Sequence, residues 1–317
     1  MDHAPLQPRD YPILEFDPSR DAVIEPSKLL PAGKLPRRCV LCFFAEVIRS
    51  VCEEPGLPVL HEMRSEMGPH PMYGLDTPGG TVAVAHPGVG ASLAGALLEE
   101  CIALGASEFI ACGGAGVLDS EIAPGKLIVP TSAVRDEGTS YHYAPPGREV
   151  EPSPEVVSAI ERVLEAHGVE YILGKTWTTD AFYRETPAKV AARKAEGCLT
   201  VEMEAAAFFA VARFRGVRFG QILYGGDDVS GIDWDPRRWD RRAAARHALF
   251  DLAVEACLAL RESLRGRCIT PADLTPGPSL RSGPPPLRKR RGGTAEGRVG
   301  EVGRGVRAPS HTGMAQL

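Results

Sequence analysis

Two glutamates stand at the boundary between a strand-like run and an apolar, helix-like run. In the stretch TVEMEAAAFFAVA, Glu202 and Glu204 flank Met203, and the residues that follow are apolar. Carboxylates at the start of a helix complement the positive end of its dipole. Carboxylates at the carboxyl end of a strand can instead bind a ligand, because open α/β sheets present their sites there. The residue types alone leave both functions open.

Glycine-rich segments follow two other strand-like runs. Gly88 and Ser92 come after the run TVAVA, and Gly113 and Gly114 come after the run EFIAC. Glycine lets the backbone approach a ligand closely, and the N–H groups that open a helix favour an anion. One such turn is typical of ordinary strand-to-helix connections. Two turns on sequential strands favour a phosphate or sugar site.

Aromatic and acidic residues follow two further strand-like runs. Phe182 and Tyr183 come after GKTWTTDA, where their rings could either stack on a flat base or cover the core. Asp227 and Asp228 follow two glycines at the end of RFGQILY. Adjacent carboxylates in this position favour a functional role over a solvated loop. Repulsion from Asp228 would also help Asp227 to keep a proton.

The elements that would position these residues alternate between strand and helix. Runs dense in Val, Ile and Ala, separated by helical patterns, predict a mostly parallel sheet covered on both faces, in one α/β domain. We expect a loop-rich N-terminal extension (1–35), a catalytic domain (36–268), and a disordered tail (269–317) rich in Pro, Gly and Arg. The predicted strands are 39–44, 81–85, 108–112, 126–134, 170–177, 199–203 and 218–224, and the main predicted helices are 45–54, 91–104, 153–168, the Ala-rich run after Met203, and 241–264.

Composition and charge narrow the class of protein. The 317 residues carry a net charge of −5, but the segment from Arg281 onward carries +6, which leaves −11 on the rest. An acidic body argues against nucleic-acid binding. The sequence holds no run of about 18 apolar residues, so we expect no membrane span. The Pro-broken N-terminus does not resemble a secretory signal, and we expect a cytoplasmic protein.

The cysteines indicate a reduced interior. CVLC has the spacing of a metal or redox pair, but it lies in a strand-like run and no second Cys or His pair follows at a suitable distance. We therefore expect buried thiols and no metal site. The eight cysteines are Cys39, Cys42, Cys52, Cys101, Cys112, Cys198, Cys257 and Cys268.

Taken together, these segments resemble the nucleoside phosphorylase family, which includes purine nucleoside and uridine phosphorylases and their nucleosidase relatives. The resemblance implies a three-layer α/β/α sandwich with a mixed, mostly parallel central sheet. It also implies homo-oligomers (dimers, trimers or hexamers) and phosphate as a co-substrate, with no cofactor. It rests on GVGAS (88–92), ACGGAGVL (111–118), PGKLIVPTSAVRDEGTSYHYAP (124–145), TTDAFY (178–183), VEMEAAAFF (201–209) and ILYGGDD (222–228).

The resemblance also assigns roles to individual residues. Glu204 would grip the ribose hydroxyls, Met203 would form an apolar floor under the sugar, and Asp227 would act as the general acid that protonates a purine leaving group. Uridine phosphorylases generally lack an acid at that position, so Asp227 favours a purine. The full assignment is ribose binding by Met203, Glu204 and Glu202, base binding by Phe182, Tyr183 and Gly114, and phosphate binding by Gly88, Ser92, Gly113 and Arg64.

The chain departs from the family pattern at the phosphate site. The first predicted strand leads into CVLCFFAEVIR instead of a Gly-Asp-Pro-x-Arg loop, and Ala111 and Gly114 replace an arginine and a Ser or Thr. A phosphate needs cationic partners to leave water. Two of the partners that the family pattern provides are missing from this chain. A phosphorylase with a rebuilt phosphate site would draw on Arg64 from a neighbouring subunit, on Arg135, or on backbone N–H groups.

Two alternatives remain open at this point. In a nucleosidase, water replaces phosphate and a carboxylate such as Glu62 or Glu66 activates it; nucleosidase relatives also lack the arginine at the place of Ala111. In a non-catalytic nucleoside-binding protein, the ribose contacts persist without turnover. A phosphorylase is the leading hypothesis.

Overall fold

The computed structural model describes residues 6–260. Its strands form one mixed sheet in the order β10-β6-β8-β9-β5-β1-β4-β3-β2. β1, β4, β5 and β10 are mutually parallel where they pair, and so are β6, β8 and β9. The strands are β1 (Arg38–Cys42), β2 (Val59–Ser65), β3 (Gly68–Thr77), β4 (Gly80–Ala85), β5 (Glu108–Val117), β6 (Leu127–Asp136), β7 (Glu149–Val150), β8 (Tyr171–Thr179), β9 (Cys198–Glu202) and β10 (Arg218–Asp228).

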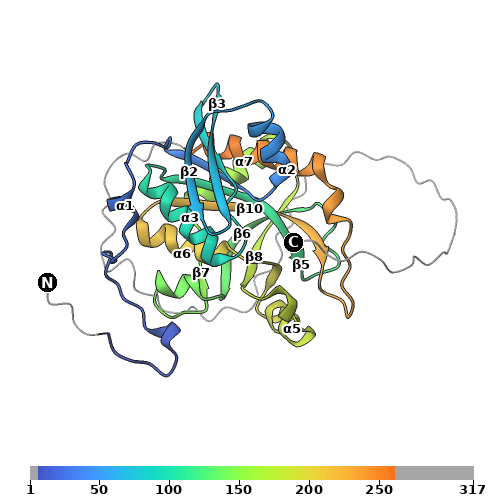
Figure 1. The fold of residues 1–317 in the computed structure, drawn as a ribbon. Coiled ribbons are helices and arrows are strands. Elements are labelled where there is room, and N and C mark those ends of the chain that lie inside the picture. The colour runs from blue at the N-terminus through green and yellow to red at the C-terminus, as the bar shows by residue number, and fades with distance from the viewer. Residues whose placement is uncertain (1–5, 261–317) are drawn as a thin grey trace, which may run out of the picture.

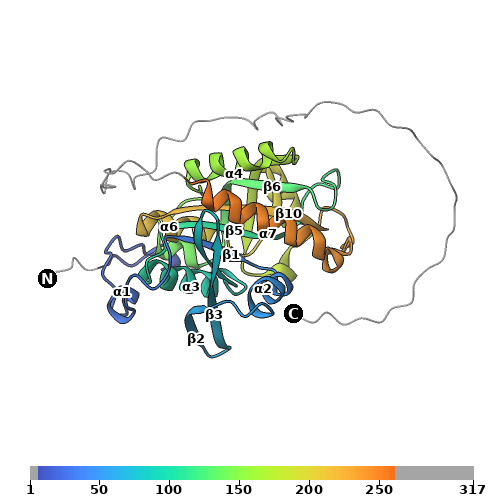
Figure 2. The same cartoon turned by 90° about the horizontal axis from the view of Figure 1, so that it is seen from above.

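Helices cover the sheet on both faces, as Figures 1 and 2 show. One core packs α4 and α7 against the sheet, and a second packs α3 and α6 against the opposite face. The α/β/α prediction is therefore confirmed. The helices are α1 (Pro26–Leu29), α2 (Ala45–Ile48), α3 (Ala91–Ala103), α4 (Pro154–Ala166), α5 (Pro187–Ala195), α6 (Ala205–Arg215) and α7 (Ala243–Leu258), with short helical turns η1 (Pro12–Leu14), η2 (Arg49–Glu53), η3 (Thr139–His142), η4 (Phe182–Arg184) and η5 (Trp239–Arg241).

The local sequence explains several of these elements. β1 is buried along nearly its whole length, as expected of an apolar strand covered on both sides. α4 begins with Pro154, whose fixed φ and missing N–H suit the first turn of a helix. α6 ends at Gly216, which adopts the left-handed conformation that closes many helices.

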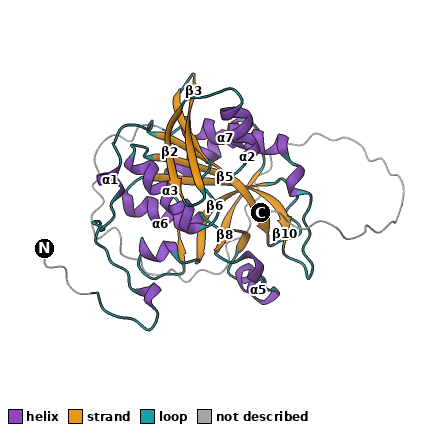
Figure 3. Ribbon diagram, viewed as in Figure 1, coloured by secondary structure: helices purple, strands orange, loops and turns teal. Residues whose placement is uncertain are grey.

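The sheet also closes on itself. β10 pairs in parallel with β5 and antiparallel with β6, so β5, β9, β8, β6 and β10 form a closed ring of strands. β5, β6, β8 and β10 lie close together in Figure 3. The candidate site draws residues from three strands of this ring, β5, β9 and β10, and from the segments that follow β1 and β4.

Two glycine-rich segments continue strands in the structure. The sequence interpretation placed a turn at the first, Gly113 and Gly114, and ended the strand before the second, Gly225 and Gly226. Gly113 and Gly114 continue β5, and Gly225 and Gly226 continue β10, whose register with β5 shifts between Gly225 and Asp228. These stretches of the two strands lie side by side, with Tyr224 opposite Gly114. The glycines are therefore needed because the neighbouring side chains pack closely against β5 and β10.

The sequence patterns missed the hairpin formed by β2 and β3, which rises from the body in Figure 1, and the helix α5. Seven of the eight cysteines are buried and free, which confirms the prediction for them. Cys268 and the predicted tail (269–317) lie outside the described residues. Among residues 6–260, no helix has the length and apolar character needed to cross a membrane.

Candidate active site

A cavity of about 190 Å³ lies at the ends of the ring strands, and five predicted site residues line it. They come from the middle of β5, from the end of β9 and from the turn that leads into α6. The sheet therefore gathers residues that are far apart in the chain. The lining consists of Phe43, Val89, Gly113, Gly114, Glu202, Met203, Glu204 and Gln221.

Glu204 is buried and aims its carboxylate at the start of α3. Its Oε1 accepts a hydrogen bond of 2.6 Å from the backbone N–H of Gly90, the residue that begins this helix. The helix start that was expected to hold an external anion therefore already binds a carboxylate of the chain itself. Burial, and next the charge of Glu202, raise the pKa of Glu204.

Glu202 has its hydrogen-bonding capacity fully used within the protein. Its Oε2 accepts the N–H groups of Glu204 and Ala205 at 2.7 and 2.6 Å, which are free donors at the start of α6. Its Oε1 accepts the hydroxyls of Thr178 and Thr176 at 2.6 and 3.4 Å. Burial raises the pKa of Glu202 in spite of these bonds. This geometry supports the helix-end interpretation of Glu202; its ribose role stays a prediction.

The two glycines of β5 permit close packing around the cavity. A Cβ on Gly113 would lie 3.0 Å from the ring of Phe43, and a Cβ on Gly114 would lie 3.2 Å from the ring of Tyr224. Phe43 therefore lies against the glycine strand in the region where a phosphate loop was expected. Any larger residue at Gly113 would displace it.

Gly88 and Ser92 do not line the cavity. The backbone N–H of Gly88 donates to His86 Nδ1 at 3.0 Å, and Ser92 Oγ lies 3.3 Å from Thr139 Oγ1. The turn contributes Val89 to the lining instead. Phosphate binding by these two residues stays a prediction.

Phe182 and Tyr183 lie on η4, outside the cavity lining. Their rings contact each other with centroids 4.0 Å apart, and both side chains are exposed to solvent. They do not cover the core, so the alternative that they roof it is not supported. As a base platform they would have to meet the base at the outer rim of the site.

Asp227, near the end of β10, makes a contact that the sequence did not predict. Its Oδ2 accepts a hydrogen bond of 2.7 Å from Trp234 Nε1. Burial, and next the charge of Asp227, raise the pKa of Glu185 to about 7. The negative charge of Asp227 therefore acts on Glu185.

Asp228 has a structural role. The structure does not support the expectation that its charge helps Asp227 to keep a proton. Its carboxylate forms an ion pair of 2.5 Å with Arg237 and accepts the backbone N–H of Ser230. Its backbone pairs with Asp235, which fastens the loop after β10. The carboxyl group on which the charge of Asp227 acts is Glu185, whose pKa it raises, and not Asp228.

The candidate phosphate cations lie away from the cavity of their own chain. Arg64 is exposed on the hairpin strand β2, where it pairs with Glu62 at 2.9 Å. Arg135 is buried and donates to Ser140 and to two backbone carbonyls of its own loop, so its guanidinium is fully engaged. Glu62 and Glu66, the candidate water activators, do not line the cavity either.

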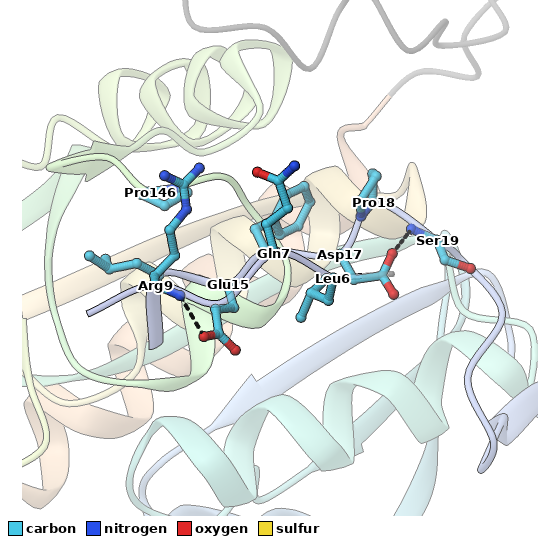
Figure 4. Close-up of a pocket in the computed structure, with 10 residues that line it drawn as sticks. Leu6, Gln7, Arg9, Glu15, Asp17, Pro18, Ser19 and Pro146 are labelled. Carbon is cyan, nitrogen blue, oxygen red and sulfur yellow. Dashed lines mark hydrogen bonds between the residues drawn. The ribbon is translucent and has the colours of Figure 1, made fainter. Parts of the chain in front are cut away.

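A wider hollow of about 950 Å³ lies elsewhere, along the N-terminal segment and Pro146 (Figure 4). Its carboxylates serve local backbone bonds: Glu15 accepts from the N–H of Arg9, and Asp17 from the N–H of Ser19. None of the predicted site residues lines it. The smaller cavity is the better candidate because it contains the paired glutamates.

The sequence did not single out Phe43, Gln221, Glu185 or Trp234. Gln221 and Phe43 lie within or directly after apolar strand runs, so nothing in their local pattern separates them from core residues. Among residues 6–260, no group of three or more His, Cys, Asp or Glu is arranged to hold a metal ion.

Comparison with known proteins decides the family. The model of the phosphorylase superfamily matches residues 37–259, which include both glutamates and all strands of the ring. The chain belongs to this superfamily. The resemblance found in the sequence is thereby confirmed.

Individual superfamily members resemble parts of the chain. A guanosine phosphorylase of Halorubrum lacusprofundi is 31% identical over 144 residues, which are 45% of this chain and 60% of that protein. A uridine phosphorylase of Treponema pallidum is 34% identical over 153 residues, 45% of this chain and 59% of that protein. The matched region thus spans about three fifths of each relative.

Solved structures share the fold over most of the chain. The uridine phosphorylase of Vibrio fischeri superposes with a TM-score of 0.59 and 24% identity, covering 72% of this chain and 94% of that one. An AMP nucleosidase of Bacteroides thetaiotaomicron gives a TM-score of 0.56 and 22% identity, with 70% and 87% covered. At these identities the likeness establishes the fold.

Proposed function

We propose that this superfamily member is a nucleoside phosphorylase. It would cleave the N-glycosidic bond of a nucleoside with phosphate as co-substrate and release the free base and ribose 1-phosphate. The observation that carries the proposal is the buried Glu204 carboxylate beside Met203 in the cavity at the strand ends. Membership of the superfamily and the resemblance to guanosine and uridine phosphorylases support it.

Each step of the reaction has a candidate residue. Glu204 accepts hydrogen bonds from the ribose hydroxyls, which are strong because the acceptor is charged. Met203 forms the apolar floor, and Phe182 stacks on the base at the rim. As the glycosidic bond breaks, negative charge grows on the base, and a proton from Asp227 neutralises it. The acid at this position favours a purine.

A nucleosidase is the second candidate, and one observation favours it. Of the described residues that line the cavity, none is Lys or Arg, and Phe43 fills space on the side of the expected phosphate loop. A doubly charged phosphate would meet two buried carboxylates there, which is unfavourable without a cation. Water carries no such cost.

Phosphate dependence separates the candidates. Base release from inosine, guanosine, adenosine, uridine and methylthioadenosine is measured with and without phosphate. A phosphorylase requires phosphate and yields ribose 1-phosphate, whereas cleavage at equal rates without phosphate identifies a nucleosidase. Binding of nucleosides without cleavage in either condition would contradict both and leave a non-catalytic binding protein.

We further propose that the protein acts as a homo-oligomer in which Arg64 reaches the phosphate of a neighbouring subunit. Arg64 is carried on the projecting β2–β3 hairpin, and its side chain is 83% exposed. The same hairpin exposes the apolar side chains of Val59 and Met67. A long, exposed cation beside apolar surface is suited to contact with another subunit.

A further inference from the structure

The carboxamide of Gln221 is the most unusual polar group in the cavity. Gln221 lies in β10 and is almost completely buried, yet its side chain lines the same cavity as Met203 and Glu204. Its Oε1 accepts no hydrogen bond from the protein. Buried polar atoms are nearly always satisfied, so an unpaired amide oxygen at a cavity indicates a group that binds a ligand.

Strand pairing explains why Gln221 reaches this cavity. In the parallel ladder between β10 and β5, Gln221 lies directly opposite Ala111. Paired residues of neighbouring strands point to the same face of a sheet, and alanine offers only a methyl group there. The longer side chain of Gln221 therefore lies on the same face as Ala111. Ala111 is the residue at the position where the family pattern has an arginine.

The rest of the wall is apolar, acidic or already bonded. Phe43 and Val89 are apolar, while Glu204 is held by the N–H of Gly90. His86 does not line the cavity; its ring lies edge-on to Phe43, its Nδ1 accepts a hydrogen bond from Gly88, and burial lowers its pKa. Gln221 is thus the lining side chain that offers both an N–H donor and an unpaired acceptor.

We propose that Gln221 positions the group that attacks the sugar. This inference rests on the proposed function, namely that the cavity holds a nucleoside. Gln221 Oε1 accepts a hydrogen bond from a hydroxyl of the attacking group, and its N–H donates to an oxygen of the same group. The shared chemistry is an oxygen nucleophile that carries a proton, either water or hydrogenphosphate. An amide binds both without the charge of a guanidinium.

The test uses Gln221→Met in the full chain, which removes the amide while keeping the side chain's length. The control is Ile222→Met, the next residue of β10, which is also fully buried but faces the opposite core. Nucleoside affinity is measured without phosphate by titration calorimetry with a nucleoside analogue whose glycosidic bond cannot be cleaved, and turnover is measured at saturating nucleoside. We expect Gln221→Met to lower turnover roughly 10- to 100-fold. The nucleoside Kd should stay within about twofold and the control should behave as wild type.

A second variant separates the two nucleophiles. Gln221→Glu adds a third carboxylate, so a phosphate-dependent reaction should fall below the level of Gln221→Met, with a higher KM for phosphate. A water-dependent reaction should remain at or above the level of Gln221→Met, because the carboxylate still accepts a hydrogen bond from water. A third variant, Gln221→Asn, keeps the amide and should retain more activity than Gln221→Met.

Three results would overturn the inference. Unchanged turnover in a folded Gln221→Met protein would show that the amide does not act in the reaction. A weakened nucleoside Kd with a matching loss of turnover would place the amide on the nucleoside instead. If the wild-type protein cleaves no nucleoside in either condition, the proposed function fails first and the inference falls with it.

Discussion

At the scale of single residues, Glu202 and Glu204 are two positions apart, but their carboxylates bind at the starts of different helices. Glu202 accepts two backbone N–H groups of the α6 start and two threonine hydroxyls. Glu204, whose backbone begins α6, turns its carboxylate across the cavity to Gly90. Glu202 is saturated by the protein, whereas Glu204 lines the cavity and is bonded there at Oε1.

The charge on Glu204 should control nucleoside affinity. Burial raises the pKa of Glu204 to about 8, so below that pH its ionised fraction rises about tenfold per pH unit. Because the carboxylate binds hydroxyls more strongly than the neutral acid does, the nucleoside Kd should fall as the pH rises from 6 to 8 and then level off. Titration calorimetry without phosphate measures this dependence.

The variant Glu204→Gln is the control for this pH profile. It should bind nucleoside roughly 10- to 100-fold more weakly, with no dependence on pH in this range. A flat profile for the wild-type protein, or a slope that survives in Glu204→Gln, would show that another group governs affinity.

Asp227 can be tested as the general acid by Asp227→Asn. The amide keeps the shape of the side chain but cannot supply the proton, so purine cleavage should fall by roughly 10²- to 10⁴-fold. Steady-state base release measures the change. Trp234→Phe, which removes the N–H that donates to Asp227 Oδ2, should cost much less because the carboxyl group remains. Turnover like that of the wild type in Asp227→Asn would refute the role.

At the scale of elements, the start of α6 depends on a short network of buried polar groups. Thr178 Oγ1 donates to Glu202 at 2.6 Å and accepts the N–H of Ala206 at 2.9 Å. Both partners are buried, so neither can turn to water. The network holds the end of β9 and the first turn of α6 together, and so it fixes the backbone that carries Glu204.

Thr178→Val should therefore destabilise the fold. Valine has nearly the same shape but leaves the Ala206 N–H and one Glu202 oxygen without a close partner, which should lower the free energy of unfolding by about 2–4 kcal/mol. Chemical denaturation monitored by circular dichroism measures the loss. Thr131→Val, at an exposed threonine of β6, should change it by less than about 0.5 kcal/mol. Equal effects of the two substitutions would contradict the network.

The glycine-rich strands show why local patterns misassigned these elements. Glycine after an apolar run is typical of a turn, and the sequence interpretation placed a turn at Gly113 and ended the last strand before Gly225. In the structure both glycines lie within strands, and glycine is required there because the ring of Phe43 and the side chain of Val117 occupy the space that their Cβ atoms would need. These glycines are needed for close packing in the tertiary structure and not for the conformation of a turn.

At the scale of the whole molecule, the oligomer should assemble complete sites from two chains. Arg64→Ala and Glu204→Gln should each be nearly inactive alone, because one lacks the lent cation and the other the sugar clamp. In a mixed dimer, one site holds an intact Glu204 and receives an intact Arg64 from its neighbour. Mixing equal amounts after dissociation should restore about one quarter of the sites.

The measurement combines phosphate-dependent base release with the mass of the assembly by light scattering. Recovery of activity on mixing, with an oligomer of unchanged mass, supports a shared site. A monomeric protein with full activity, or no recovery from two correctly assembled variants, would show that Arg64 does not complete a neighbouring site.

The sequence by itself determined the order of most strands and helices and the family. Runs of apolar residues and their spacing depend on local chemistry, so β1, α3, α4 and α6 lie where the patterns predict them. The expectation that Met203 and Glu204 lie at a ligand site also needed only the rule that α/β sheets present ligands at strand ends.

The tertiary structure decided which of these residues meet. The pairing of β10 with β5 placed Gln221 opposite Ala111, and the packing of Phe43 on Gly113 shaped the cavity. The tertiary structure also pairs Asp228 with Arg237, and it brings Glu185 within the electrostatic influence of Asp227. Most of these contacts join residues that lie far apart in the sequence. The others depend on the direction in which one side chain points. Strand register and close packing fix them, and neither is encoded in any local pattern.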